Sequence, residues 1–177
     1  MNPNERLGNN HGGHLDEGPQ EEPVNPLRRR RLVVAVMSGL LLGNARGAGG
    51  SVTRVEVWKG PSCVCCEDWV THLTSKGFSV KVHDEGNTEA RERLGMPVKF
   101  GSCHTARVGR FVLEGHVPAA DVYRLLKERP NAVGLAVPAM PRGSPGMDGP
   151  DYRGVRDPFN VLLVLHNGTA RVFQSYT

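Results

Sequence analysis

The sequence has few aromatic residues, no long hydrophobic run and no basic surface pattern. Aromatic side chains make up 6% of its 177 residues. The formal charge of +4 is matched by Arg28–Arg31 alone, and beyond residue 47 the chain has 16 Lys and Arg against 13 Asp and Glu. Nucleic-acid binding normally needs a basic stripe with interleaved aromatics. We therefore expect no nucleic-acid partner.

The longest apolar run lies near the N-terminus and is short. Leu32–Gly43 has twelve residues, whereas a membrane-spanning helix needs about 20. The order of Arg28–Arg31, this run and a small-residue stretch is typical of a secretory signal, with Ala45 to Gly47 as a cleavage site. We predict a disordered polar leader over 1–26, a signal or an uncleaved membrane anchor over 27–47, and a periplasmic domain over 52–177.

Cysteine is scarce, but its few copies are concentrated. Three of the four cysteines, Cys63, Cys65 and Cys66, fall within four residues, and the fourth, Cys103, precedes His104. A disulfide between the adjacent Cys65 and Cys66 would be strained. A structural disulfide does not need cysteines crowded in this way. Soft-metal binding and thiol redox chemistry both use several converging thiolates.

The hydrophobic patterning predicts alternating strands and helices followed by a hairpin. We expect strands over 52–58, 78–83 and within 106–115, helices from the cysteines to Gly77, over 87–94 with Asn87 as its cap and over 117–129, and a hairpin over 159–173. This order predicts an α/β protein, a single thioredoxin-like domain with cysteines at its first strand–helix junction. Such folds carry a cis proline facing the cysteines, and Asp157–Pro158 is the candidate.

A long segment rich in glycine and proline separates the last predicted helix from the hairpin. Residues 134–158 contain Met140 and Met147, and loops of this length within a compact domain are often functional. The thioethers can bind Cu(I) transiently or line a path to a site. They can equally anchor the loop on the core.

Several motifs in this order resemble the CopG-type metal-binding proteins of bacterial copper resistance. They are Pro-Ser-Cys-Val-Cys-Cys-Glu-Asp-Trp (61–69), Ser-Cys-His-Thr-Ala (102–106), Glu-Gly-His-Val-Pro-Ala (114–119), Gly-Leu-Ala-Val-Pro (134–138) and Met-Pro-Arg-Gly-Ser-Pro-Gly-Met (140–147). The resemblance implies a thioredoxin-like extracytoplasmic domain that binds copper, with a change of copper redox state as a candidate activity. Ala139 departs from the pattern, where glycine is expected.

The residue chemistry independently favours copper. Cu(I) prefers thiolates, and a helix N-terminus favours the thiolate form of cysteine. We expect the metal ligands to be Cys63, Cys65, Cys66 and Cys103. His104 is the nearest candidate nitrogen ligand and His116 a more distant one, for which a capping or core hydrogen bond is the alternative.

Two other functions remain open at this stage. A thiol–disulfide oxidoreductase would use Cys63 and Cys66 as a Cys-x-x-Cys pair, leaving Cys65 surplus. Structural zinc would need four Cys or His ligands, which the sequence provides. We expect copper ions as the bound species, periplasmic copper-handling proteins as candidate partners, and copper oxidation or reduction as the candidate enzymatic activity.

Overall fold

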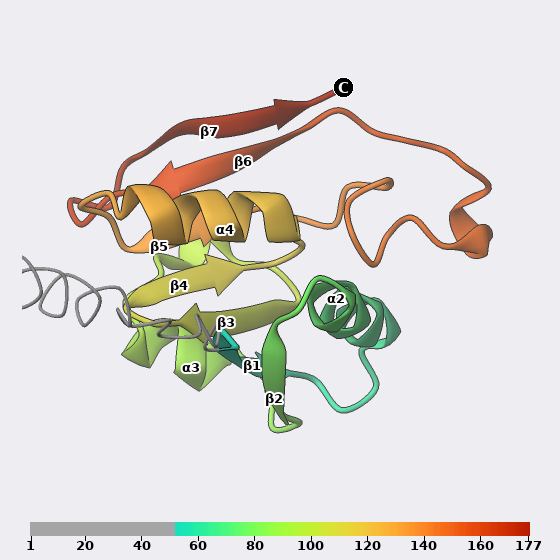
Figure 1. Cartoon of the computed structure of the whole chain (residues 1–177), viewed down its shortest axis with the longest axis horizontal. Helices are drawn as coiled ribbons and strands as arrows, with labels where there is room; N and C mark the ends of the chain where they lie inside the picture. The colour runs from blue at the N-terminus through green and yellow to red at the C-terminus, as the bar shows by residue number, and fades with distance from the viewer. Residues whose placement is uncertain (1–51) are drawn as a thin grey trace, which may run out of the picture. The chain divides into compact units, whose positions relative to one another are not determined.

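The computed structural model describes residues 52–177, so the predicted leader and signal lie outside the described residues. One seven-stranded sheet, ordered β2-β1-β3-β4-β5-β6-β7, carries helices on its faces (Figure 1). The strands are β1 Arg54–Lys59, β2 Ser79–His83, β3 His104–Val108, β4 Phe111–Glu114, β5 Gly134–Ala136, β6 Phe159–Val164 and β7 Ala170–Tyr176. The helices are α2 Val64–Ser75, α3 Thr88–Arg93 and α4 Ala119–Glu128, with 3-10 turns η1 Val98–Phe100 and η2 Pro150–Tyr152. The α/β class is confirmed.

The strand directions show that the sheet contains a β-α-β unit followed by a β-β-α unit. Strand β1 pairs in parallel with β2 through the crossover helix α2, and β3 lies antiparallel to both β1 and β4. Strand β5 is parallel to β4, and β6 and β7 extend the sheet antiparallel. The cysteine motif lies at the β1–α2 junction, as the sequence predicts. The name thioredoxin-like stays a prediction, which this β-α-β and β-β-α connectivity supports.

Side-chain alternation divides the core between the two sheet faces. On one face, Leu113 and its neighbours pack with Trp69 of α2 and Leu125 of α4. On the other face, Val112 packs with Met96 and Phe100, which follow α3. The alternation therefore sends His104 toward the α2 face and Glu114 toward the α3 face.

Two predicted elements differ in the structure. The strand expected within 106–115 is the hairpin β3–β4, because Gly109, at φ +56°, reverses the chain in the middle of a continuous alternating pattern. Strand β5 occupies the start of the segment predicted as a loop over 134–158. The terminal hairpin is present as β6–β7, with Gly168 in its turn.

The predicted cis peptide at Asp157–Pro158 is wrong, since every peptide bond within 52–177 is trans. The trans form of an X–Pro bond is favoured by about 0.5–1 kcal/mol, and the chain here runs directly into β6. Asp157 is tied instead to Arg142, whose guanidinium donates to both carboxylate oxygens at 2.7 and 2.9 Å.

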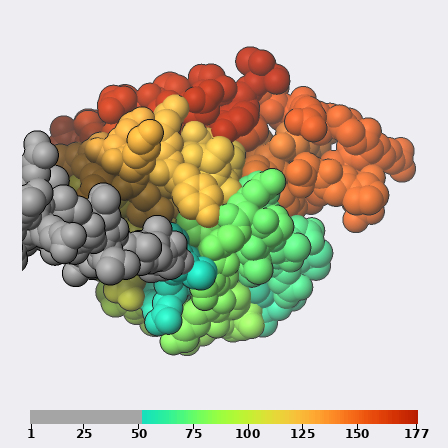
Figure 2. All heavy atoms as spheres, in the orientation of Figure 1, coloured from blue at the N-terminus to red at the C-terminus, as the bar shows by residue number. Residues whose placement is uncertain are grey.

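The segment between β5 and β6 projects from one end of the domain beside α2 (Figure 2). It contains both methionines of the loop and the short turn η2. Among residues 52–177, none of the helices has the length and apolar character needed to cross a membrane.

Candidate metal centre

The β1–α2 junction and the start of β3 bring the four cysteines together. Cys63 stands at the N-cap of α2 in an extended conformation, and Cys65 and Cys66 lie in the first helical turn. Lys59, at the end of β1, pairs with His104, at the start of β3. Cys103, which precedes His104, therefore lies at the same edge of the sheet as the N-terminus of α2.

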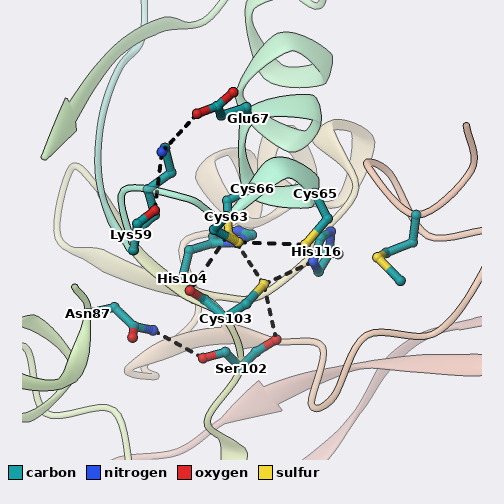
Figure 3. The surroundings of a disulfide bond; sticks show 12 residues. Lys59, Cys63, Cys65, Cys66, Glu67, Asn87, Ser102, Cys103, His104 and His116 are labelled. Carbon is teal, nitrogen blue, oxygen red and sulfur yellow. Dashed lines mark hydrogen bonds and ion pairs between the residues drawn. A yellow bond between two sulfur atoms is a disulfide. The ribbon is translucent and has the colours of Figure 1, made fainter. Parts of the chain in front are cut away.

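Two overlapping groups of side chains are close enough to hold a metal ion (Figure 3). The first contains the sulfurs of Cys63, Cys65, Cys66 and Cys103, which all lie within 4.8 Å of one another. The second contains Cys103, His104 and His116, with ligand atoms within the same limit. Cys103 belongs to both groups, so sulfur and nitrogen donors meet at one thiol.

Within the sulfur group, Cys63 and Cys66 form a disulfide with their Cα atoms 5.3 Å apart. Cys65 and Cys103 are free thiols. The Cys65 sulfur lies 3.6 Å from the Cys63 sulfur. The disulfide thus joins the two cysteines of the motif that have Cys-x-x-Cys spacing. Reduction of this bond would make four thiols available.

His116 points its Nε2 atom at Cys103, with 3.1 Å between nitrogen and sulfur. Its other nitrogen, Nδ1, lies 2.8 Å from the carbonyl oxygen of Pro145. A carbonyl only accepts hydrogen bonds, so Nδ1 carries the proton and the lone pair of Nε2 faces the Cys103 sulfur. Burial lowers the pKa of His116, which favours this neutral form. A hydrogen bond from the second ring nitrogen to a carbonyl is a contact that orients metal-binding histidines.

His104 is completely buried and packs against Trp69, with ring centroids 4.3 Å apart. Its Nδ1 lies 3.4 Å from the Cys103 sulfur, and its Nε2 has no hydrogen-bond partner among residues 52–177. Burial, followed by the neighbouring His116, holds the pKa of His104 well below its usual range. Both histidines are therefore neutral and place a ring nitrogen near the Cys103 sulfur.

The Cys103 thiol lies outside α2, directly before β3. Burial, followed by the charge of Cys65, raises the pKa of Cys103 to about 12. Metal binding must then displace the thiol proton, as metal coordination commonly does.

A buried ion pair fixes the turn that carries Cys103. Glu114 is fully buried and accepts hydrogen bonds from the Ser102 amide at 2.7 Å, the Thr105 hydroxyl at 2.7 Å and Arg91 Nε at 3.0 Å. Arg91 also donates to the Ser102 carbonyl at 2.7 Å. The pair thus hydrogen-bonds to both the backbone amide and the backbone carbonyl of Ser102, the residue before Cys103. Sequence reasoning missed it, although a glutamate ending the apolar run Phe-Val-Leu-Glu (111–114) was a signal.

Asn87 occupies the N-cap position of α3, as the sequence predicts, but its side chain makes no capping hydrogen bond and contributes instead to the same turn. Its side-chain amide donates to the Ser102 carbonyl at 3.1 Å and to the Thr105 hydroxyl at 3.3 Å, away from the α3 backbone. The helix itself begins and ends where expected, with Gly95 at φ +76° after it.

The loop after β5 packs against α2 and His116 at the candidate metal centre. Gly146, at φ +86°, lies very near α2. A Cβ atom there would be 2.5 Å from the Cys65 carbonyl oxygen and 2.8 Å from the backbone nitrogen of Trp69. Only glycine fits, and the approach brings the Pro145 carbonyl to His116. Met147 is buried and accepts a hydrogen bond from Tyr152, whereas Met140 is 49% exposed.

The fold and the site define an α/β protein with a cluster of thiols and imidazoles able to hold a metal ion. A family model described as a protein of unknown function, DUF411, matches residues 100–147. Solved structures described as copper resistance protein copG, forms 2 and 1, are 41% and 42% identical to this chain, each with a TM-score of 0.65. They cover 72% and 71% of this chain and 100% and 98% of their own. No curated protein matches. The chain belongs to the CopG family of copper resistance proteins.

Proposed function

We propose that this protein binds Cu(I) outside the cytoplasm through Cys63, Cys65, Cys66 and Cys103, and interconverts Cu(I) and Cu(II). The observation that carries the proposal is that Cys103 is shared by a four-sulfur group and a Cys-His-His group, each within 4.8 Å. The relatives described as copper resistance proteins support copper as the metal.

The donor set fits this use of copper. Thiolates prefer the soft Cu(I) ion, whereas imidazole also suits Cu(II). His104 and His116 are buried and held neutral, so each can offer a lone pair without first losing a proton. A centre in which Cys103 lies within reach of both sulfur and nitrogen donors can therefore serve both oxidation states.

The cysteine pair can also supply the electrons for copper reduction. Oxidation of the Cys63 and Cys66 thiolates to their disulfide releases two electrons, which convert two Cu(II) ions to two Cu(I) ions. No further reductant is needed for one turnover, and an external thiol would restore the pair.

A thiol–disulfide oxidoreductase is the second candidate function, because Cys63 and Cys66 form the disulfide that it requires. An insulin-reduction assay separates the two functions. We expect slow turnover, since any exposed thiolate exchanges to some degree. Turnover comparable to that of a dedicated thioredoxin, lost on replacing Cys63 or Cys66 with serine, would favour the oxidoreductase.

The decisive experiment is anaerobic titration of the reduced protein with copper and zinc both present. We expect copper to be retained, and Cys103→Ser to abolish most binding because this thiol joins both groups. Met96→Leu, which removes a buried sulfur from the second core cluster, is the control and should bind normally. Full copper stoichiometry in a variant with all four cysteines changed to serine would contradict the proposal.

A further inference from the structure

Met140 is a thioether at the surface beside the candidate metal centre. It is 49% exposed, unlike Met96 and Met147, which are buried at 3% and 8% exposure. An open depression of about 420 Å³ is lined by both Met140 and Cys103, together with Ser102 and Ala139. The methionine therefore borders the same opening as the thiol that links the sulfur and nitrogen groups.

The position of Met140 is fixed relative to Cys103 by a short connection. The Ser102 hydroxyl donates to the Ala139 carbonyl at 2.7 Å, which ties the residue before Cys103 to the residue before Met140. Ala139 itself has φ +62°, a left-handed conformation that turns the chain at this point and is unfavourable for alanine. The hydrogen bond holds the turn, so Met140 stays at the rim.

The surroundings suit a soft, singly charged ion. Among the residues that the structure describes, Arg91 is the only ionisable group besides Cys103 that lines this depression. Its charge is paired with Glu114 at 2.9 Å. Met140 and Ala139 also line a second open depression, of about 540 Å³, on their other side. The thioether thus stands between two solvent-filled hollows, where a copper donor can approach it.

We propose that Met140 receives Cu(I) from its donor and passes it to Cys103, an inference that rests on the proposed function. The bond between copper and the donor ligand breaks as the Met140 sulfur binds. The Cys103 sulfur then displaces the thioether and releases its proton to solvent. A neutral thioether binds Cu(I) through a soft sulfur without the charge of a thiolate, so the ion moves onward to the cysteines.

The test is the rate at which reduced protein takes Cu(I) from its bicinchoninate complex, followed anaerobically by the loss of the complex's colour. Met140→Leu should slow the transfer several-fold and leave the final copper stoichiometry unchanged. The variant changes an exposed side chain, so its melting temperature should match that of the parent. Met96→Leu, which removes a thioether remote from the depression, should transfer copper at the parental rate.

Three outcomes would overturn the inference. An unchanged rate in Met140→Leu, or an equal slowing in Met96→Leu, would remove Met140 from the path. A lower final stoichiometry in Met140→Leu would make it a resident ligand and not a transfer residue. A parent protein that takes up no Cu(I) would instead contradict the proposed function itself, which distinguishes that failure from the three outcomes that concern Met140.

Discussion

The two histidines beside Cys103 offer the clearest test at the scale of single residues. We expect His104→Ala and His116→Ala to raise the copper reduction potential, because Cu(II) loses more ligation than Cu(I) when imidazole is removed. Tight Cu(I) binding should remain in both. His116, whose Nε2 lies 3.1 Å from the Cys103 sulfur, is placed at least as well as His104, whose Nδ1 lies at 3.4 Å.

Electrochemical titration measures this shift. His166→Ala, which changes an exposed histidine in the β6–β7 turn, is the matched control and should keep the parental potential. An unchanged potential in both site variants would leave only sulfur at the centre and make the protein a Cu(I) store.

Ala139 gives a second prediction at this scale. A left-handed backbone costs a residue with a side chain roughly 1–2 kcal/mol, and Ala139 has φ +62°. We expect Ala139→Gly to raise the free energy of unfolding by roughly 0.5–1 kcal/mol, after allowing for the greater freedom of glycine in the unfolded chain. Urea denaturation measures the change. Ala120→Gly, in the helix α4, should destabilise; if both variants lose stability, the backbone argument is wrong.

At the scale of elements, the Arg91–Glu114 pair joins α3 to the β3–β4 hairpin and to the turn before Cys103. Removing one partner of a buried ion pair usually costs about 3–5 kcal/mol. We expect Glu114→Gln to lower the free energy of unfolding by up to this amount and to weaken copper binding, because the neutral amide leaves one acceptor oxygen for the three donors Arg91, Ser102 and Thr105. Both urea denaturation and copper competition measure the effect.

Glu128→Gln is the matched control, since Glu128 forms an exposed i,i+4 pair with Arg124. Exposed pairs contribute about 0–1 kcal/mol, so this variant should retain both stability and copper affinity. Parental copper affinity in Glu114→Gln, at any stability, would show that the pair does not position Cys103.

Much of this architecture could be predicted from local pattern. Residue alternation, the glycines after α2 and α3, and the Asn-Gly turn of the last hairpin all act over a few residues. The β3–β4 hairpin was missed because the alternation continues through its turn. The hydrogen bond from the Ser102 amide to Glu114 was missed because it joins residues on separate elements, which only the sheet register brings together.

The candidate site shows the same division. The cysteine cluster could be predicted because three of its members are adjacent in the chain. The role of His116 could not be separated from a capping role, since its contact with the Pro145 carbonyl depends on a loop 29 residues away. The choice of Cys63 and Cys66 for the disulfide was one of the alternatives that the sequence left open.

At the scale of the whole molecule, a thiol redox couple forms part of the proposed copper-binding centre. With the Cys63–Cys66 disulfide formed, only Cys65 and Cys103 remain as thiols. Two of the four proposed sulfur ligands are then unavailable. Copper affinity should therefore follow the oxidation state of the protein, and a reducing environment should favour retention of the ion.

As copper ligands, Cys63 and Cys66 can bind Cu(I) only when their disulfide is reduced. The same preparation is titrated anaerobically with Cu(I) in competition with bicinchoninate, before and after reduction of the disulfide and removal of the reductant. We expect tight binding in the reduced protein and a large loss of affinity or stoichiometry in the oxidised protein. Equal binding by the two forms would contradict this role of Cys63 and Cys66.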